Sequence, residues 1–182
     1  ILPTPVVGTV GLIPSSGDFL PSGAWEEGDV LFLVGPCNPS LAGSGYIRSL
    51  GLPLRGRPLV FSGEAERDFS ERAVRTARKK AAHSGRALAG GGLAAALAKD
   101  ASESGSGARI ALGVPTRKDV VLFGEGGARA LYSVPMSRVP LFKTIWSGYP
   151  CLELGRAGGD VLSVEGAFSL EVSRLREIWR NR

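Results

Sequence analysis

The sequence has 182 residues, which suits one domain of ordinary size with a short piece of a neighbouring domain attached. Hydrophobic residues make up 43% and charged residues 21% of the chain, as in globular proteins, so a wholly disordered chain is excluded. The formal net charge is +5, but the Lys and Arg residues are dispersed and not interleaved with aromatic residues, which argues against nucleic-acid binding.

The cysteines and the hydropathy pattern indicate the compartment. Cys37 and Cys151 lie far apart without CxxC spacing, so we expect free thiols in a reducing environment. Since the sequence contains neither a signal peptide nor an apolar run of about 18 residues, we expect a cytoplasmic protein with no membrane contact. The chain begins without Met inside a strand-like run, which suggests a fragment of a longer polypeptide.

The first third of the chain contains two apolar runs. Residues 1–13 are rich in β-branched residues and precede a turn cluster, so we predict a strand and then a linker. We assign residues 1–27 to the end of a preceding domain and residues 28–182 to one α/β domain. Residues 29–35 predict a strand that is buried on both faces. Residues 44–50 are ambiguous, and residues 58–61 predict a short strand or an extended segment.

A helix is predicted over residues 64–84, which contain no Gly or Pro and place acidic residues early and basic residues late. Gly85 is the predicted stop. The helix carries a basic cluster of Arg72, Arg75, Arg78, Lys79 and Lys80. We interpret this cluster mainly as a solvated surface, with attraction to a phosphorylated small molecule or an acidic partner as the alternative. No nucleophile motif accompanies His83, so we expect it at a helix end and not in catalysis.

The remaining chain alternates between strand and helix patterns. Gly92 leads into a second predicted helix over residues 93–101, followed by a loop over 102–107. Ser169 is the predicted N-cap of a last helix, in which Val172, Leu175 and Ile178 follow helical spacing. We expect strands over 108–113, 120–123, 130–134, 151–154 and 161–164, and a short helix over 139–146. The pattern predicts an α/β or α+β fold with a mixed β-sheet covered by helices.

The triple glycine Gly90, Gly91 and Gly92 precedes the second helix. A glycine turn into a helix N-terminus exposes backbone N–H groups and the positive end of the helix dipole, which together bind phosphate. Three glycines also permit a tight turn and close packing, so both interpretations stay open. The spacing matches neither the P-loop nor the Rossmann pattern.

The other polar residues do not assemble into a recognisable active site. Glu125 and Arg129 lie in a glycine-rich segment, where they could face a ligand or form a local ion pair. Paired carboxylates and metal-ligand spacing are absent from the sequence, so we predict neither catalytic residues nor a metal site in this chain.

Several segments resemble, in the same order, those of a known family. They are the opening residues 1–13, the strand segment 28–35, Leu41-Ala-Gly-Ser-Gly-Tyr46, residues 84–99, Leu122-Phe-Gly-Glu-Gly-Gly-Ala-Arg129, and the closing Leu-Arg-Glu-Ile-Trp helix in 170–179. Together they resemble the synthetase C-terminal domain of phosphoribosylformylglycinamidine synthase, in the superfamily of aminoimidazole ribonucleotide synthetase.

The resemblance implies the aminoimidazole ribonucleotide synthetase C-terminal-domain-like fold and a role in a purine-biosynthetic ligase. The family converts formylglycinamide ribonucleotide to formylglycinamidine ribonucleotide with ATP and with ammonia from glutamine. The resemblance implies that the full-length enzyme uses ATP and Mg²⁺, and it assigns no cofactor to this chain alone. It also implies two kinds of partner, namely the N-terminal domains of the same enzyme and a glutaminase subunit. The isolated chain is expected to be inactive.

The departures from the family pattern bear on the site. Where the family has His-Asp-x-Ser-Glu-Gly-Gly, this sequence has Arg86-Ala-Leu-Ala-Gly-Gly-Gly92. The resemblance therefore implies a degenerate nucleotide or phosphate site at Gly90, Gly91, Gly92, Arg86, Ser44 and Glu125. Backbone phosphate contacts need no side chain, and Arg86 could supply positive charge. The alternatives are a non-catalytic protein-interaction module, or a superfamily relative such as a selenophosphate or thiamine-phosphate enzyme.

Overall fold

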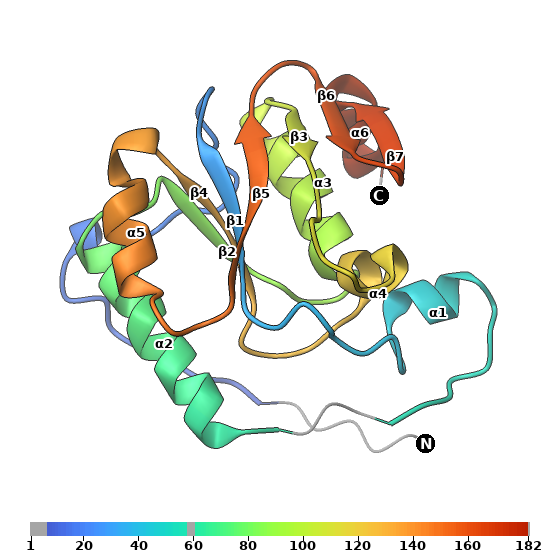
Figure 1. The fold of residues 1–182 in the computed structure, drawn as a ribbon, viewed down its shortest axis with the longest axis horizontal. Helices are drawn as coiled ribbons and strands as arrows, with labels where there is room; N and C mark the ends of the chain where they lie inside the picture. Colours follow the sequence, from blue (N-terminus) through green and yellow to red (C-terminus); the bar gives the residue numbers. More distant parts are fainter. Residues whose placement is uncertain (1–6, 58–60, 182) are drawn as a thin grey trace.

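The computed structural model describes residues 7–57 and 61–181, which form one sheet with helices on both faces (Figure 1). The seven strands follow the order β2-β4-β1-β5-β3-β6-β7. Neighbouring strands run antiparallel except for β3 and β6, which are parallel, so the sheet is mixed as predicted. The strands are β1 (Val30–Val34), β2 (Ser84–Ala87), β3 (Ala108–Ile110), β4 (Ala130–Val134), β5 (Cys151–Ala157), β6 (Val161–Val164) and β7 (Phe168–Glu171).

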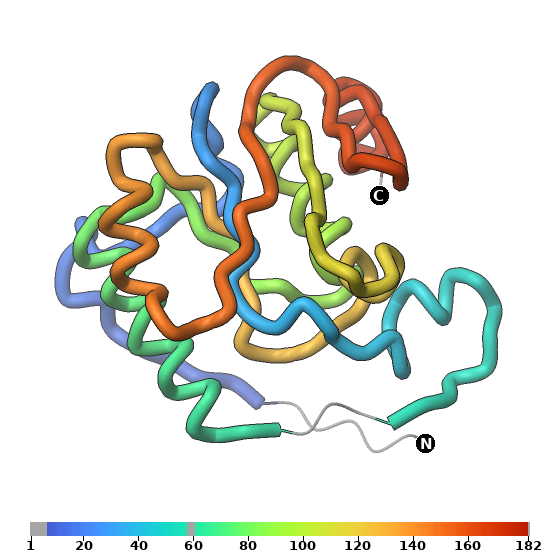
Figure 2. Tube along the Cα trace, in the orientation of Figure 1, coloured from blue at the N-terminus to red at the C-terminus, as the bar shows by residue number. Residues whose placement is uncertain are grey.

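The helices divide between the two faces, and Figures 1 and 2 show α2 with α5 on one side and α3 with α4 and α6 on the other. The helices are α1 (Gly45–Ser49), α2 (Gly63–Arg78), α3 (Gly92–Ser104), α4 (Lys118–Phe123), α5 (Val139–Ile145) and α6 (Val172–Arg180), with short 3-10 turns η1 (Ser16–Asp18) and η2 (Met136–Arg138). The described part of the chain contains no helix that is long and apolar enough to cross a membrane.

Strand β1 separates two hydrophobic cores. Leu31 and Leu33 pack into the core beneath α3, α4 and α6, whereas Val30, Phe32 and Val34 pack into the core beneath α2 and α5. The prediction of a strand buried on both faces is confirmed, because alternate side chains enter different cores.

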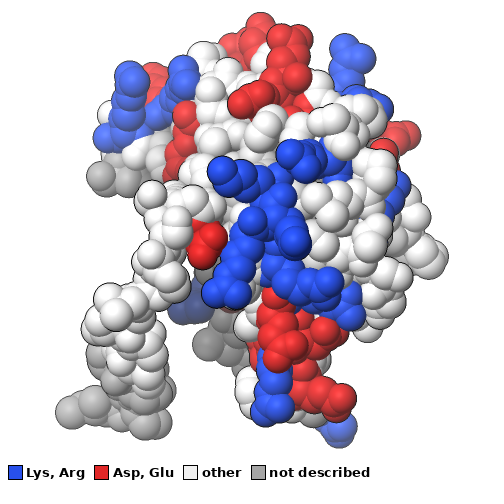
Figure 3. All heavy atoms as spheres, turned by 90° about the vertical axis from the view of Figure 1, so that its left-hand side faces the viewer, with Lys and Arg blue, Asp and Glu red and all other residues white. Residues whose placement is uncertain are grey.

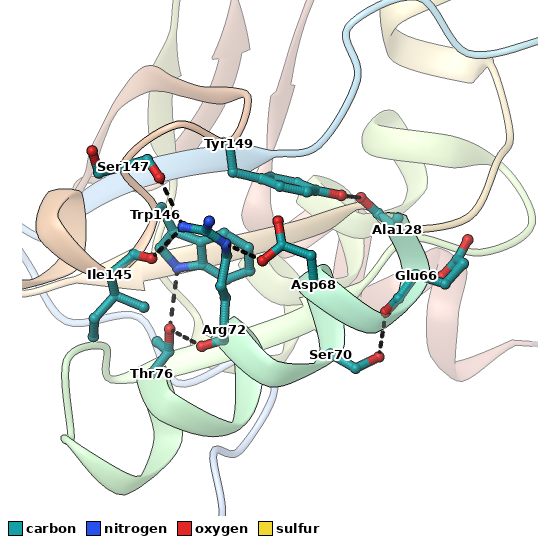
Figure 4. A network of polar contacts seen from close by, with 10 residues as sticks. All are labelled: Glu66, Asp68, Ser70, Arg72, Thr76, Ala128, Ile145, Trp146, Ser147 and Tyr149. Carbon is teal, nitrogen blue, oxygen red and sulfur yellow. Dashed lines mark hydrogen bonds and ion pairs between the residues drawn. The ribbon is translucent and has the colours of Figure 1, made fainter. Parts of the chain in front are cut away.

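Helix α2 is tied to the end of α5 by hydrogen bonds as well as by packing (Figure 4). The Arg72 guanidinium donates to the carbonyl oxygens of Ile145 and Ser147 at 2.7 and 2.8 Å, and to Asp68 at 2.7 Å. The Trp146 indole N–H donates to the Thr76 hydroxyl at 3.1 Å. Arg72 is therefore a structural residue, while the rest of the basic cluster is exposed.

The predicted helix over 64–84 is too long. It ends at Arg78, and Lys79 and Lys80 form its C-terminal turn, so Ser84 and Gly85 belong to strand β2. Gly85 is not a helix stop but a strand residue, where an added Cβ would lie 2.7 Å from the Tyr132 ring. The second helix, by contrast, continues beyond the predicted range to Ser104.

Two further predictions are wrong. Residues 118–123 form helix α4 and not a strand, and only one face of this short helix is buried, through Val121 and Leu122. Ser169 lies in strand β7, paired with Ser163, and Glu171 occupies the N-cap of α6. An apolar run of four residues does not distinguish a short strand from a buried helical turn.

The N-terminal segment differs from its prediction in part. Residues 7–13 form no strand and are exposed, and residues 1–6 and 58–60 lie outside the described residues. Trp25 is only 5% exposed and packs into the α3 core, and Leu20 packs against the α2 core. The division of the chain at residue 27 stays a prediction.

Candidate functional site

Three loops meet beside the N-terminus of α3. The loop after β1 and the loop before β4 are joined by two backbone hydrogen bonds between Ser40 and Glu125, of 2.8 and 3.2 Å. This pairing brings Ser44 and Glu125, which are far apart in sequence, to the triple glycine.

The Glu125 carboxylate is the centre of this site. Its Oε1 atom accepts the backbone N–H of Gly45 at 2.8 Å and that of Gly91 at 2.9 Å. Gly45 is the first residue of α1, and Gly91 is the N-cap of α3. A carboxylate near a helix N-terminus is stabilised by the helix dipole. The position that an external phosphate would occupy at these two amides is therefore held by an anion of the protein itself.

Arg129 fixes the loop that carries Glu125. Arg129 is 2% exposed, and its guanidinium donates to the carbonyl oxygens of Gly124 at 3.0 Å and Val121 at 3.3 Å. Burial lowers the pKa of Arg129 to about 10, so the group remains cationic at neutral pH. The alternative of an ion pair between Glu125 and Arg129 is wrong, because these two described side chains contact different groups.

The backbone of the triple-glycine turn requires glycine at two of its three positions. Gly91 and Gly92 have φ angles of +86° and +63°, which strain any residue with a Cβ. A Cβ on Gly92 would also lie 2.7 Å from the carbonyl oxygens of Leu122 and Gly124. Gly90 is exposed and meets neither constraint. The tight turn and close packing therefore account for two of the three glycines.

Arg86 lines a cavity of about 140 Å³ together with Gly90 and Gly92, but its charge is already neutralised. Its guanidinium forms ion pairs with Asp100 and Glu103 of α3. Asp100 is fully buried, and burial raises the pKa of its carboxyl to about 6 although the Arg86 hydrogen bond acts in the opposite direction. Arg86 thus connects β2 to α3.

Ser44 is buried and caps α1, accepting the Ile47 N–H on its Oγ atom at 3.4 Å. The structure therefore brings Ser44, Gly91 and Glu125 into one hydrogen-bonded corner, with Gly90 and Gly92 beside it and Arg86 at its edge.

An apolar groove next to this corner was missed in the sequence analysis. Tyr46 and Phe123 stack with ring centroids 4.4 Å apart and planes inclined by 7°. They border a groove of about 560 Å³ that is otherwise lined mainly by α3 and by the apolar side of β7 and α6. The sequence did contain a sign of this groove, because Tyr46 lies two residues after Ser44 and Phe123 lies two residues before Glu125.

The chemistry of the site does not fit a magnesium ion. Mg²⁺ prefers several oxygen ligands in octahedral geometry. Glu125 is the carboxylate at this corner, and its Oε1 atom already accepts two N–H groups. Within residues 7–57 and 61–181, no group of three His, Cys, Asp or Glu side chains could hold a metal ion.

Known proteins share this fold and this sequence pattern. Residues 26–164 match the family described as AIR synthase related protein, C-terminal domain. The phosphoribosylformylglycinamidine synthase subunit PurL of Anaeromyxobacter sp. (strain Fw109-5) is 34% identical over 193 residues, covering all of this chain and 25% of that protein. PurL of Anaeromyxobacter sp. (strain K) is 36% identical, again over all of this chain and 25% of its own length.

A solved structure agrees at the level of the fold. T. maritima PurL complexed with FGAR superposes with a TM-score of 0.73 at 13% identity, covering 88% of this chain and 30% of that one. The chain thus spans about a quarter of the length of the curated relatives that it matches.

Proposed function

The chain belongs to the AIR synthase related protein, C-terminal domain family, and from this we propose that it acts as the C-terminal domain of a phosphoribosylformylglycinamidine synthase. Such an enzyme converts formylglycinamide ribonucleotide to formylglycinamidine ribonucleotide with ATP and with ammonia from glutamine. The whole-chain similarity to PurL supports this assignment over the other superfamily members.

Within the enzyme, this domain serves as a structural, degenerate nucleotide half-site formed by Ser44, Gly90, Gly91, Gly92, Glu125 and the edge residue Arg86. The observation that carries the proposal is the Glu125 Oε1 atom on the N–H groups of Gly45 and Gly91. The backbone of a phosphate site is retained, and an internal carboxylate takes the place of the phosphate.

The test is a titration with ADP, followed through the backbone amide resonances of Gly45 and Gly91. In the wild type these resonances should not respond, because the carboxylate occupies the site and repels a phosphate. Glu125→Ala should gain saturable binding, with an affinity at least about tenfold higher, since phosphate contacts to helix N-termini are favourable. Glu125→Gln keeps an acceptor oxygen and should show a smaller gain.

Glu64→Ala is the matched control, because it removes an exposed carboxylate from the first turn of α2. It should leave the titration unchanged. Saturable ADP binding to Gly91 in the wild type, unaltered in Glu125→Ala, would show a working nucleotide site and contradict the proposal. A thermal melt of each variant shows whether the variant is still folded, so that a change in ADP binding can be assigned to the site.

The cofactors and partners follow from the same assignment. ATP and Mg²⁺ would act in the full-length enzyme at sites built largely by other domains, and a structure of T. maritima PurL complexed with ATP supports the nucleotide. The N-terminal domains of the same enzyme and a glutaminase subunit would be the protein partners, in the cytoplasm.

The groove beside α3 supports a second, non-catalytic role in which this domain docks against another domain of the same polypeptide. The groove is apolar, and Ile178 on its rim is 43% exposed. Exposed apolar patches mark interaction sites. In the full-length synthase, Ile178→Asp should lower the melting temperature, whereas Met136→Asp, at a similarly exposed apolar position in η2, should not. Equal effects of the two variants would count against docking at the groove.

A further inference from the structure

Another cavity lies on the α2 side of the sheet, away from the triple glycine. It has a volume of about 500 Å³ and is bordered by η1, by the turn after α2 and by η2. Its charged or titratable lining residues are Lys80, His83 and Arg138, and its described lining includes no Asp or Glu. Ser16 and Ser137 add hydroxyl groups. The cavity is therefore basic.

The two permanent cations at this cavity are not neutralised by the protein. Lys80 and Arg138 are exposed, and neither has a carboxylate within 4 Å among the described residues. The nearby Arg78, by contrast, is paired with Asp18 at 3.7 Å. Figure 3 shows Lys and Arg side chains gathered in a band on the face formed by α2. A cavity lined by one sign of charge concentrates ions of the opposite sign.

His83 is held in a fixed orientation at the wall of the cavity. Its Nδ1 atom lies 2.9 and 3.1 Å from the two carboxylate oxygens of the buried Asp29. Asp29 also accepts the Ser133 hydroxyl and the Glu26 backbone N–H. Because Nδ1 donates its N–H to the carboxylate, Nε2 of the neutral ring is an acceptor, which can receive the P–O–H hydrogen of a phosphate monoanion. Glu26 is the nearest exposed carboxylate, 3.8 Å from Nδ1.

Lys80 occupies a backbone position that favours glycine. It has a φ of +50°, and the hydrogen bonds from the N–H of Lys80 to Ala77 and from that of Ala81 to Thr76 form a Schellman motif. A residue with a Cβ is strained at this position, and such strain is typical of functional sites. The chain thus has lysine at the rim of the basic cavity where glycine would be more stable.

We propose that the cavity formed by Lys80, His83 and Arg138 binds a phosphate group, either free or as the monoester of a small molecule. Its volume lies within the range of small-molecule sites, and phosphate accepts hydrogen bonds from ammonium, guanidinium and hydroxyl donors together. This inference does not depend on the triple glycine or on the proposed enzyme.

The test is the substitution Lys80→Gly. Glycine relieves the strained backbone and removes the cation, so the melting temperature should rise while phosphate binding weakens. Binding is measured by calorimetric titration with inorganic phosphate and with glycerol 3-phosphate at constant ionic strength, and by the amide shifts of residues 80–83 and 137–138. Loss of one exposed cationic contact should weaken binding about fivefold. Arg138→Gln should weaken it similarly.

Arg75→Gln is the matched control, because Arg75 is exposed on the same helix and does not line the cavity. It should change the affinity far less than the two test variants. A stronger response to glycerol 3-phosphate than to phosphate identifies a monoester as the ligand. An absence of saturable binding, or equal losses in Arg75→Gln and Lys80→Gly, would overturn the proposal.

Discussion

Arg86 joins strand β2 to helix α3 through two ion pairs within the domain. Its side chain is 14% exposed and pairs with the buried Asp100 and the exposed Glu103 of α3. Removing one partner of a buried ion pair leaves an uncompensated charge, which typically costs about 3 kcal/mol. Arg86→Met should therefore lower the free energy of unfolding by about 3 kcal/mol, measured by urea denaturation.

Arg117→Met provides the comparison, because the Arg117–Asp119 pair lies on the surface. It should leave the denaturation midpoint nearly unchanged. If the wild type bound ADP at the triple glycine and Arg86→Met lost that binding without losing stability, Arg86 would instead be assigned to a ligand.

The same pair predicts a pH dependence. Burial raises the pKa of Asp100 in the folded protein to about 6, compared with about 4 in an unfolded chain. The folded state therefore holds the proton more tightly, and this contribution to stability is full below about pH 4 and lost as the pH rises through 6. It amounts to at most about 3 kcal/mol, because each pKa unit corresponds to roughly 1.4 kcal/mol.

Asp100→Asn removes this titration. Between pH 4 and 7, the unfolding free energy of the wild type should fall relative to that of Asp100→Asn. A difference that stays constant over this range would mean that Asp100 has an ordinary pKa in the folded protein.

At the scale of elements, helix α3 is packed on one side and open on the other. Ala101 is fully buried in the core, whereas Ala95 is half-buried and borders the two cavities beside the triple glycine. Overpacking a buried position costs about 1–3 kcal/mol. Ala101→Leu should therefore lower the unfolding free energy by about 2 kcal/mol, whereas Ala95→Leu should cost less. Calorimetric melts of both variants measure the difference.

Elements whose pattern reflects burial could be predicted from the sequence. β1 is a continuous apolar run, and β4 is apolar except for Ser133. Both runs have the length of a buried strand, and all their residues are buried. β2 could not be predicted, because Ser84, Gly85 and Arg86 have no strand preference and are placed by backbone pairing with β4. Strand propensity depends on such tertiary context.

The sequence predicted which residues form the site but not the contacts between them. The resemblance selected Ser44, Glu125 and the triple glycine, and these residues do meet. It could not show that Glu125 contacts the N–H groups of Gly45 and Gly91, since those contacts cross 80 and 34 positions of sequence. Nor could it show that Arg86 is held by α3, because a cation in a sequence gives no sign of its partner.

At the scale of the whole molecule, the segment before β1 has two parts. Residues 7–13 are exposed, whereas Trp25 belongs to the hydrophobic core. Val10 is fully exposed, while Trp25 is 5% exposed in the α3 core. Truncating a buried Trp typically costs about 3–5 kcal/mol, whereas a surface substitution usually changes stability by less than about 0.5 kcal/mol. Trp25→Ala should lower the unfolding free energy by about 3 kcal/mol, and Val10→Ala should change it by less than about 0.5 kcal/mol.

Urea denaturation of the two variants checks this prediction and bears on the domain boundary at residue 27. A small effect of Trp25→Ala would place residues up to 27 outside the cooperative unit. A large effect would place the boundary between Val10 and Trp25.

Strand β2 forms one edge of the sheet, and the segment that precedes β1 runs along that edge. The outward-facing N–H of Gly85 donates to the carbonyl oxygen of Pro21 at 2.9 Å. An unoccupied strand edge is a template on which a second chain can add by backbone pairing. Because a short piece of its own chain takes that place, the protein is protected at this edge against self-association into extended sheets at high concentration.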